Sequence, residues 1–180
     1  MSTVEKSIDV NVPVRTAYDQ WTRFEQFPEF MEGVEQVQQL DEKRLRWKAK
    51  IGGVTREWDA EIVQQEPDQS IAWRATTGTK NDGAVLFDAD PMNTGLTHVR
   101  LRMEVEPEGA VEKAADALHV IDLRVKGDLE RFKKIVEERG TDPGGWRGEV
   151  KPSGQVKEVN EGSAGLGGTT GGGALGNTHT

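Results

Sequence analysis

The segment 43–62 most constrains the fold, because it has the pattern of a two-stranded hairpin whose cross-strand pairs can be worked out. Gly52-Gly53 is the two-residue signal of a tight hairpin turn. With these glycines as the loop, one face pairs opposite charges across the strands: Lys48 with Glu57, Arg46 with Asp59, and Arg44 with Glu61. The alternate face is apolar apart from one arginine, and it carries Leu45, Trp47, Ala49, Ile51, Val54, Arg56, Trp58, Ala60 and Ile62. The pattern predicts a sheet with one face in water and the other covered.

Composition excludes several classes of function. The chain of 180 residues has a formal net charge of −8, whereas nucleic-acid binding needs a basic patch for phosphates. It has no cysteine, so disulfides, zinc-thiolate sites and cysteine nucleophiles are excluded. We find no metal site or cofactor motif, no apolar run long enough for stable membrane insertion and no secretory h-region. A cytoplasmic protein is expected, and the sequence leaves transient membrane contact and oligomeric state open.

The order of predicted elements is strand, two helices, six strands and one long helix. A first strand alternates from Val4 to Val12, a helix begins near Pro13, and Pro28 suits the start of a second, short helix. Six strands are expected at 34–40, 43–51, 54–65, 70–76, 84–89 and 96–105. The last of these alternates most clearly, with Val99, Leu101, Met103 and Val105 on one side.

A single amphipathic helix is predicted over residues 108–139, and Gly140 suits its C-terminal cap. Its apolar residues recur at spacings of three and four: Val111, Ala114, Leu118, Ile121, Val125, Leu129, Phe132 and Val136. The same spacing also serves a coiled-coil arm. We favour a helix lying across the dry face of the sheet, because that face otherwise lacks cover.

Composition shifts sharply after Gly140. The last 40 residues hold 12 of the 21 glycines and few large apolar side chains. We therefore predict one domain over 1–140 and a flexible Gly-rich tail over 141–180. Trp146 is the exception in the tail, and it either docks on the domain or stays exposed.

This order of elements resembles the helix-grip fold of the START-like or SRPBCC superfamily, in particular its polyketide cyclase/dehydrase and coenzyme Q-binding START-like branch. The resemblance covers nearly all of residues 1–140. It is carried by residues 7–14, 17–21, Phe24, 27–31, Trp58, Trp73, 83–87 and 95–109. It implies an α+β fold in which a curved antiparallel sheet of about seven strands wraps around the long C-terminal helix. It also implies a START-like ligand-binding domain, with a cavity between sheet and helix for a small hydrophobic molecule.

The expected cavity wall follows from the dry faces and the resemblance. The candidate ligand-binding residues are Trp47, Arg56, Trp58, Trp73, Phe87, Leu101, Met103, Leu118, Ile121 and Val125. Apolar side chains line cores and pockets alike, so each aromatic residue has both interpretations. Arg56 is more discriminating, because a guanidinium on an apolar face needs a partner. It either extends to water at the sheet edge or holds a carbonyl, phenolate or carboxylate of a ligand.

Few residues suggest catalysis. His98, His119 and His179 form no nucleophilic triad or metal set by their spacing. A cyclase or dehydratase needs an acid or base beside its substrate, and Arg56, Tyr18 and Asp122 are the candidates.

Three functions remain. The favoured one is binding or transfer of a polyketide, quinone or lipid. The alternatives are a polyketide aromatase/cyclase or dehydratase, and a non-enzymatic protein-interaction domain with a filled core.

Overall fold

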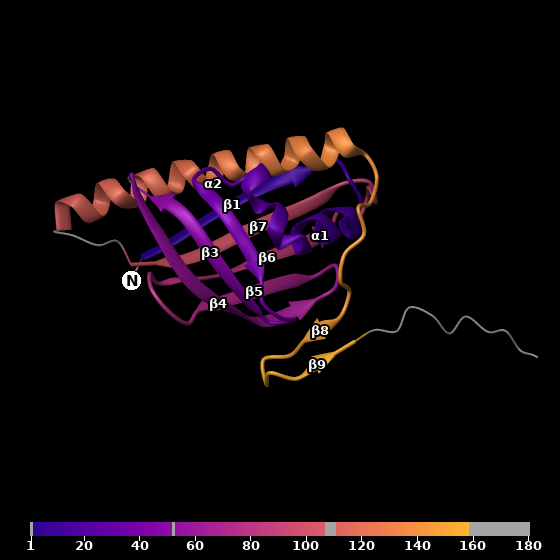
Figure 1. Ribbon diagram of the computed structural model, residues 1–180. Helices are drawn as coiled ribbons and strands as arrows, with labels where there is room; N and C mark the ends of the chain where they lie inside the picture. Colours follow the sequence, from indigo (N-terminus) through magenta and orange to yellow (C-terminus); the bar gives the residue numbers. More distant parts are fainter. Residues whose placement is uncertain (1, 52, 107–110, 159–180) are drawn as a thin grey trace, which may run out of the picture.

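The computed structural model describes residues 2–51, 53–106 and 111–158, without the side chains of 111–114. A single antiparallel sheet with a long helix along its concave side dominates the architecture (Figure 1). In chain order the elements are β1 (Ser2–Val10), α1 (Val14–Thr22), η1 (Phe24–Glu29), β2 (Val34–Gln39), β3 (Arg44–Ile51), β4 (Val54–Glu66), β5 (Ser70–Ala75), β6 (Asn81–Ala89), β7 (Thr97–Val105), α2 (Val111–Arg139), β8 (Glu149–Val150) and β9 (Val156–Lys157). This confirms the predicted α+β fold, and the described part of the chain has two short strands, β8 and β9, beyond the predicted seven.

The sheet order is β1-β7-β6-β5-β4-β3-β2, so consecutive strands pair as a meander from β2 to β7, and β1 closes the far edge. The register slips by one residue beside Val34 and again beside Ile62. Such bulges bend a strand and increase its twist. They therefore help the sheet to curve around α2.

The β3–β4 hairpin has the register predicted from its turn. Arg46 pairs with Asp59, Trp47 with Trp58, and Ile51 with Val54. Arg46 donates to both carboxylate oxygens of Asp59, at 2.9 and 3.2 Å. Arg44 and Glu61, which were predicted to pair, bind other residues. Arg44 forms an ion pair with Asp41 at 2.6 Å, and Glu61 forms one with Arg74 at 3.3 Å. The side-chain alternation of the hairpin is therefore as predicted, while its ion pairs also involve residues outside it.

The helix α2 packs against the sheet, so the coiled-coil alternative is wrong. Its stripe of Val125, Leu129, Phe132 and Val136 is buried in the core cluster. Lys6 on β1 forms an ion pair of 2.9 Å with Asp122 on α2. Gly140 ends the helix with a φ of +63°, which is the left-handed conformation of a C-terminal glycine cap.

An aromatic core lies between α1, η1 and α2. The ring centroids of Trp21 and Phe132 lie 4.9 Å apart, and those of Phe27 and Phe30 lie 5.4 Å apart. Tyr18 is fully buried and contacts the ring of Phe87 edge-on at 5.5 Å. This packing fixes α1 and η1 as one wall of the molecule.

Residues 141–158 of the predicted tail pack on the domain, and residues 159–180 lie outside the described part of the chain. The segment runs from the end of α2 past α1 to the edge of β4 (Figure 1), where Val150 pairs with Gln65 and is fully buried. Trp146 docks on the core cluster. The glycines hid this role, because Gly145 is needed for close approach: a Cβ there would lie 2.2 Å from Thr22 Oγ1.

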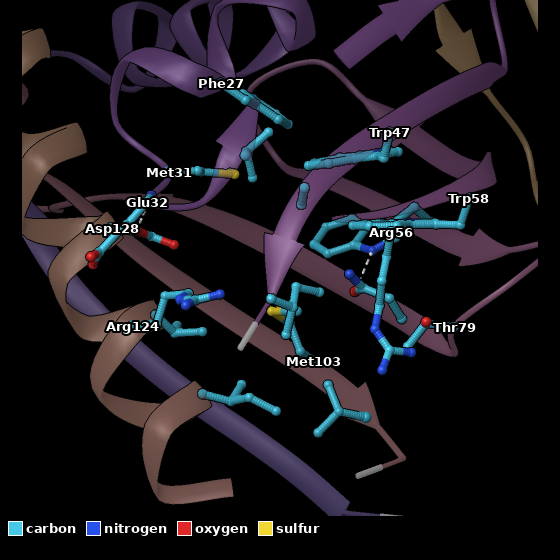
Figure 2. A pocket seen from close by; sticks show the side chains of 18 of the residues that line it. Phe27, Met31, Glu32, Trp47, Arg56, Trp58, Thr79, Met103, Arg124 and Asp128 are labelled. Carbon is cyan, nitrogen blue, oxygen red and sulfur yellow. Dashed lines mark hydrogen bonds between the residues drawn. The ribbon is translucent and has the colours of Figure 1, made fainter. Parts of the chain in front are cut away.

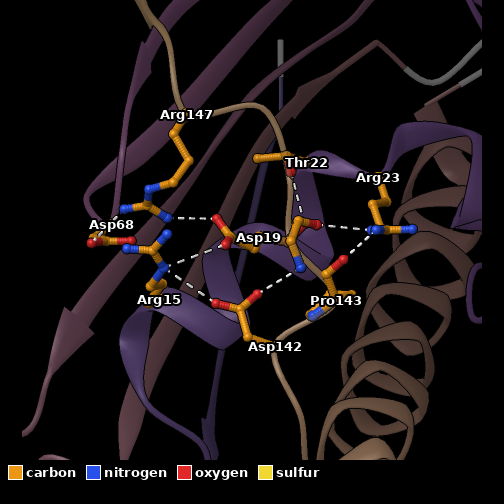
Figure 3. A network of polar contacts seen from close by, with 9 residues as sticks. Arg15, Asp19, Thr22, Arg23, Asp68, Asp142, Pro143 and Arg147 are labelled. Atoms are coloured by element: carbon orange, nitrogen blue, oxygen red, sulfur yellow. Dashed lines mark hydrogen bonds and ion pairs between the residues drawn. The ribbon is translucent and has the colours of Figure 1, made fainter. Parts of the chain in front are cut away.

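Charged side chains fasten this segment to α1 and to the β4–β5 turn (Figure 3). Arg147 binds Asp19 at 2.6 Å and Asp68 at 2.7 Å. Asp142 lies 3.3 Å from Arg15. We name residues 141–158 the C-terminal strap.

Candidate ligand-binding cavity

A cavity of about 450 Å³ lies between the concave face of the sheet, η1 and α2. Its volume is within the range of small-molecule sites. Most of its wall is apolar and aromatic, and Figure 2 shows part of this lining. The helix α2 runs along β1 at one side of the sheet. It therefore does not cover all the apolar side chains on the concave faces of β3, β4 and β7, and the cavity lies over them.

Eight of the residues predicted from the sequence line this cavity: Trp47, Arg56, Trp58, Trp73, Leu101, Met103, Ile121 and Val125. Phe87 and Leu118 do not. Phe87 is buried between Tyr18 and Trp21 in the aromatic core. Leu118 packs on the core cluster, about 60° around α2 from Ile121.

Two stacked indoles form part of the wall. Trp47 and Trp58 face each other across β3 and β4 with their rings 5.7 Å apart and nearly parallel, at 9°. Phe27 from η1 continues this surface, 5.5 Å from Trp47. Such stacked rings suit a flat apolar ligand, because aromatic faces attract each other in offset stacks.

A third indole lies over a glycine. Trp73 on β5 pairs with Gly83 on β6, and a Cβ at Gly83 would lie 2.5 Å from Trp73 Cζ2. Trp73 Nε1 donates to Asn81 Oδ1 at 3.4 Å. Gly83 therefore lets the indole lie flat against the sheet and leaves the space above it open.

Arg56 projects from β4 into the cavity lining near Thr79 of the β5–β6 connection (Figure 2). Lys80 of the same connection and Asn81, the first residue of β6, also line the cavity. Arg56 is half-buried. Lys80 lies 3.8 Å from Asp82. We call this group the Arg56 end of the cavity. A guanidinium there can donate several hydrogen bonds and accept none.

A second polar group lines the opposite side, from α2 and the loop before β2 (Figure 2). Asp128 Oδ1 accepts from the Glu32 backbone N–H at 2.9 Å and from Arg131. Burial raises the pKa of Asp128, while the bonds from Glu32 and Arg131 oppose this shift. Arg124, one turn before Asp128 on α2, also lines the cavity. We call Arg124, Asp128 and Glu32 the Asp128 end.

Only one of the three predicted catalytic candidates lines the cavity. Arg56 lines the cavity, whereas Tyr18 and Asp122 are not in its lining. Burial raises the pKa of Tyr18, and Asp122 pairs with Lys6 on the β1 side of α2. His98 lies on the wet face of the sheet between Asp9 and Asp90. Among the described residues, no three acidic or histidine side chains gather as a metal site would require.

The comparisons identify the family. A family model described as "Polyketide cyclase / dehydrase and lipid transport" matches residues 10–134. The chain belongs to this family. A curated relative in Streptomyces lincolnensis, an uncharacterized 17.2 kDa protein, is 47% identical over 150 residues, which cover 83% of this chain and 99% of the relative.

Solved structures share the fold of this polyketide cyclase/dehydrase family protein. The Zhui aromatase/cyclase from Streptomyces sp. R1128 has a TM-score of 0.66 at 16% identity, over 80% of this chain and 98% of its own. A START superfamily protein from Mycobacterium smegmatis has a TM-score of 0.58 at 17% identity, over 76% and 95%. Both structures confirm the fold that the resemblance implied. No helix in the described residues is long and apolar enough to cross a membrane.

Sequence reasoning missed the Asp128 end and most of the Arg56 end. Arg124 and Asp128 follow Ile121 at spacings of three and seven, so they share its helix face. That spacing was a usable signal. No periodicity could have found Thr79 or Asn81, because they belong to a connection and its junction with β6.

Proposed function

We propose that the protein binds a flat, apolar small molecule in this cavity and that Arg56 holds an oxygen acceptor of that molecule. One observation carries the proposal: an apolar aromatic cavity of about 450 Å³ has a guanidinium in its lining. Each 100 Å² of ligand surface buried against such a wall contributes roughly 2.5 kcal/mol before the costs of association. Arg56 then supplies orientation, since a guanidinium suits carbonyl, phenolate and carboxylate oxygens.

Binding or transfer of a polyketide, quinone or lipid-like molecule fits this site best. The alternative of a protein-interaction domain assumed a filled core, whereas the described residues enclose a cavity. The cavity therefore favours ligand binding over a role in protein interaction alone.

A second candidate is a polyketide aromatase/cyclase or dehydratase. Asp128 favours it, because a carboxyl group with a raised pKa beside a cavity can transfer a proton to or from a bound molecule. The family description and the name of the Zhui protein point the same way. This activity would require turnover of a bound polyketide.

Arg56→Met tests both candidates. The protein and its variant are purified from the cells that make it, and native mass spectrometry and extraction then identify the small molecules that each retains. We expect retention by the wild type and roughly 10-fold weaker binding by the variant, because a hydrogen bond to a charged group contributes about 1.5–3 kcal/mol. Arg46→Met is the matched control, since Arg46 bonds Asp59 on the wet face.

The outcomes separate the candidates. Weaker retention without any product supports a binding protein. Unchanged retention with lost turnover would overturn the pure binding function and support the enzyme. A wild-type protein that never carries a small molecule, under several growth conditions, would contradict the proposal itself.

A further inference from the structure

The cavity has polar groups on two opposite sides, and only the Arg56 end has a role in the proposed function. The Asp128 end lies across the cavity, on the α2 side (Figure 2). The side chains of Met103 and the Trp47–Trp58 pair line the space between. The proposed function assigns no ligand group to the Asp128 end.

The sheet register separates the backbone positions beside the two ends. Arg56 on β4 pairs with Ala49 on β3, and Ala49 pairs with Val34 on β2. Neighbouring strands lie about 4.8 Å apart, so this row spans about 10 Å. Glu32, whose backbone N–H binds Asp128, precedes Val34 by two residues. A single small polar group cannot reach both ends.

The chemistry of the two ends also differs. Arg56 can only donate hydrogen bonds. At the other end the charges of Arg124 and Arg131 face those of Asp128 and Glu32, with Arg131 bound to Asp128 and 3.9 Å from Glu32. This balance disfavours a second ionised group. A carboxyl group takes a neutral hydroxyl in either protonation state, accepting from it when ionised and donating to it when protonated.

We propose that Asp128, with Arg124, forms a second recognition site that binds a hydroxyl group of the ligand. The ligand is then an elongated, flat, apolar molecule that reaches both ends, with an acidic or carbonyl oxygen at the Arg56 end and a hydroxyl at the Asp128 end. This inference rests on the proposed function and specifies its ligand class.

Both hydrogen bonds to Asp128 noted above are accepted by Oδ1, which leaves Oδ2 for the ligand. The bond from Glu32 fixes the carboxyl group on α2, so it is held in place before the ligand arrives. Burial, which raises the pKa of Asp128, is consistent with an environment that favours an uncharged partner.

Three naphthoic acids test the inference with the wild-type protein. Isothermal titration calorimetry measures the Kd of 2-naphthoic acid, 6-hydroxy-2-naphthoic acid and 3-hydroxy-2-naphthoic acid. We expect the 6-hydroxy acid to bind about 10-fold more tightly than the unsubstituted acid, because its hydroxyl reaches the far end. The 3-hydroxyl lies beside the carboxylate and should give no such gain. An equal gain from both hydroxyls would overturn the second site.

Variants locate the contact. Asp128→Asn should reduce the preference for the 6-hydroxyl to about 3-fold, because an amide makes only a neutral hydrogen bond, and Asp128→Ala should abolish it. Asp122→Asn on the same helix is the matched control and should keep it, since Asp122 pairs with Lys6 and is not in the lining. An unchanged preference in folded Asp128→Ala would refute the role of Asp128. If none of the three acids binds below about 1 mM, the proposed function fails instead.

Discussion

Arg147→Met should destabilise the protein by removing the cation that fastens the C-terminal strap. Arg147 spans two carboxylates, at 2.6 Å from Asp19 and 2.7 Å from Asp68, and its side chain is 13% exposed. Asp19 is 1% exposed. Removing one partner of a buried pair leaves an uncompensated charge and costs about 3–5 kcal/mol. We expect about 3 kcal/mol at pH 8, because Arg15 lies 3.8 Å from Asp19 and offsets part of the loss.

The control for this prediction is Arg46→Met. Arg46 also bonds both oxygens of an aspartate, but its side chain is 54% exposed. Exposed pairs contribute about 0–1 kcal/mol. Urea unfolding followed by circular dichroism gives both free energies of unfolding. Equal losses in the two variants would refute the reasoning that burial decides the cost.

The pH dependence gives a second test of the same contact. Burial raises the pKa of Asp19 from 3.8 to about 6, and the contact with Asp142 acts in the same direction, while Arg147 opposes it. The native state therefore binds a proton more tightly than the unfolded chain does. This group favours folding at low pH, and its contribution is lost as pH rises from about 4 to 6. In Arg147→Met the carboxyl group should stay protonated to higher pH, so the loss at pH 5 should be smaller than at pH 8.

Two further predictions concern the sheet. Gly83→Ala should cost about 1–3 kcal/mol and weaken ligand binding, because its Cβ would lie 2.5 Å from Trp73 Cζ2 and 2.8 Å from the Arg102 carbonyl oxygen; unfolding and titration measure this, and a neutral effect would contradict the tight fit. The hydrogen bond with Asp9, followed by that with Asp90, raises the pKa of His98 above 6.5. Its stabilising effect is present below pH 6.5 and is lost as pH rises through the higher native pKa. An NMR titration should show this pKa falling in Asp9→Asn, and no change would refute the role of Asp9.

The parts of the site that could be predicted lie on regular strands. Trp47, Trp58 and Arg56 share the predicted face of the β3–β4 hairpin because a strand alternates and a two-residue turn fixes the register. Phe87 has the same apolar character as its neighbours, yet it faces α1 and belongs to the core. Which apolar residue meets a cavity depends on where the covering helix leaves space, and pattern alone does not contain that information.

The sequence by itself determined the register of the β3–β4 hairpin and the amphipathic helix α2, because these depend on local periodicity and turn chemistry, and its resemblance to known proteins pointed to the family. Only the tertiary structure decided that α2 leaves a cavity over β3 and β4, that Asp128 meets it opposite Arg56, and that the C-terminal strap packs through Arg147. Each of these depends on contacts between residues far apart in the chain. The glycine-rich composition after Gly140 gave no sign that close approach and buried ion pairs hold the strap in place.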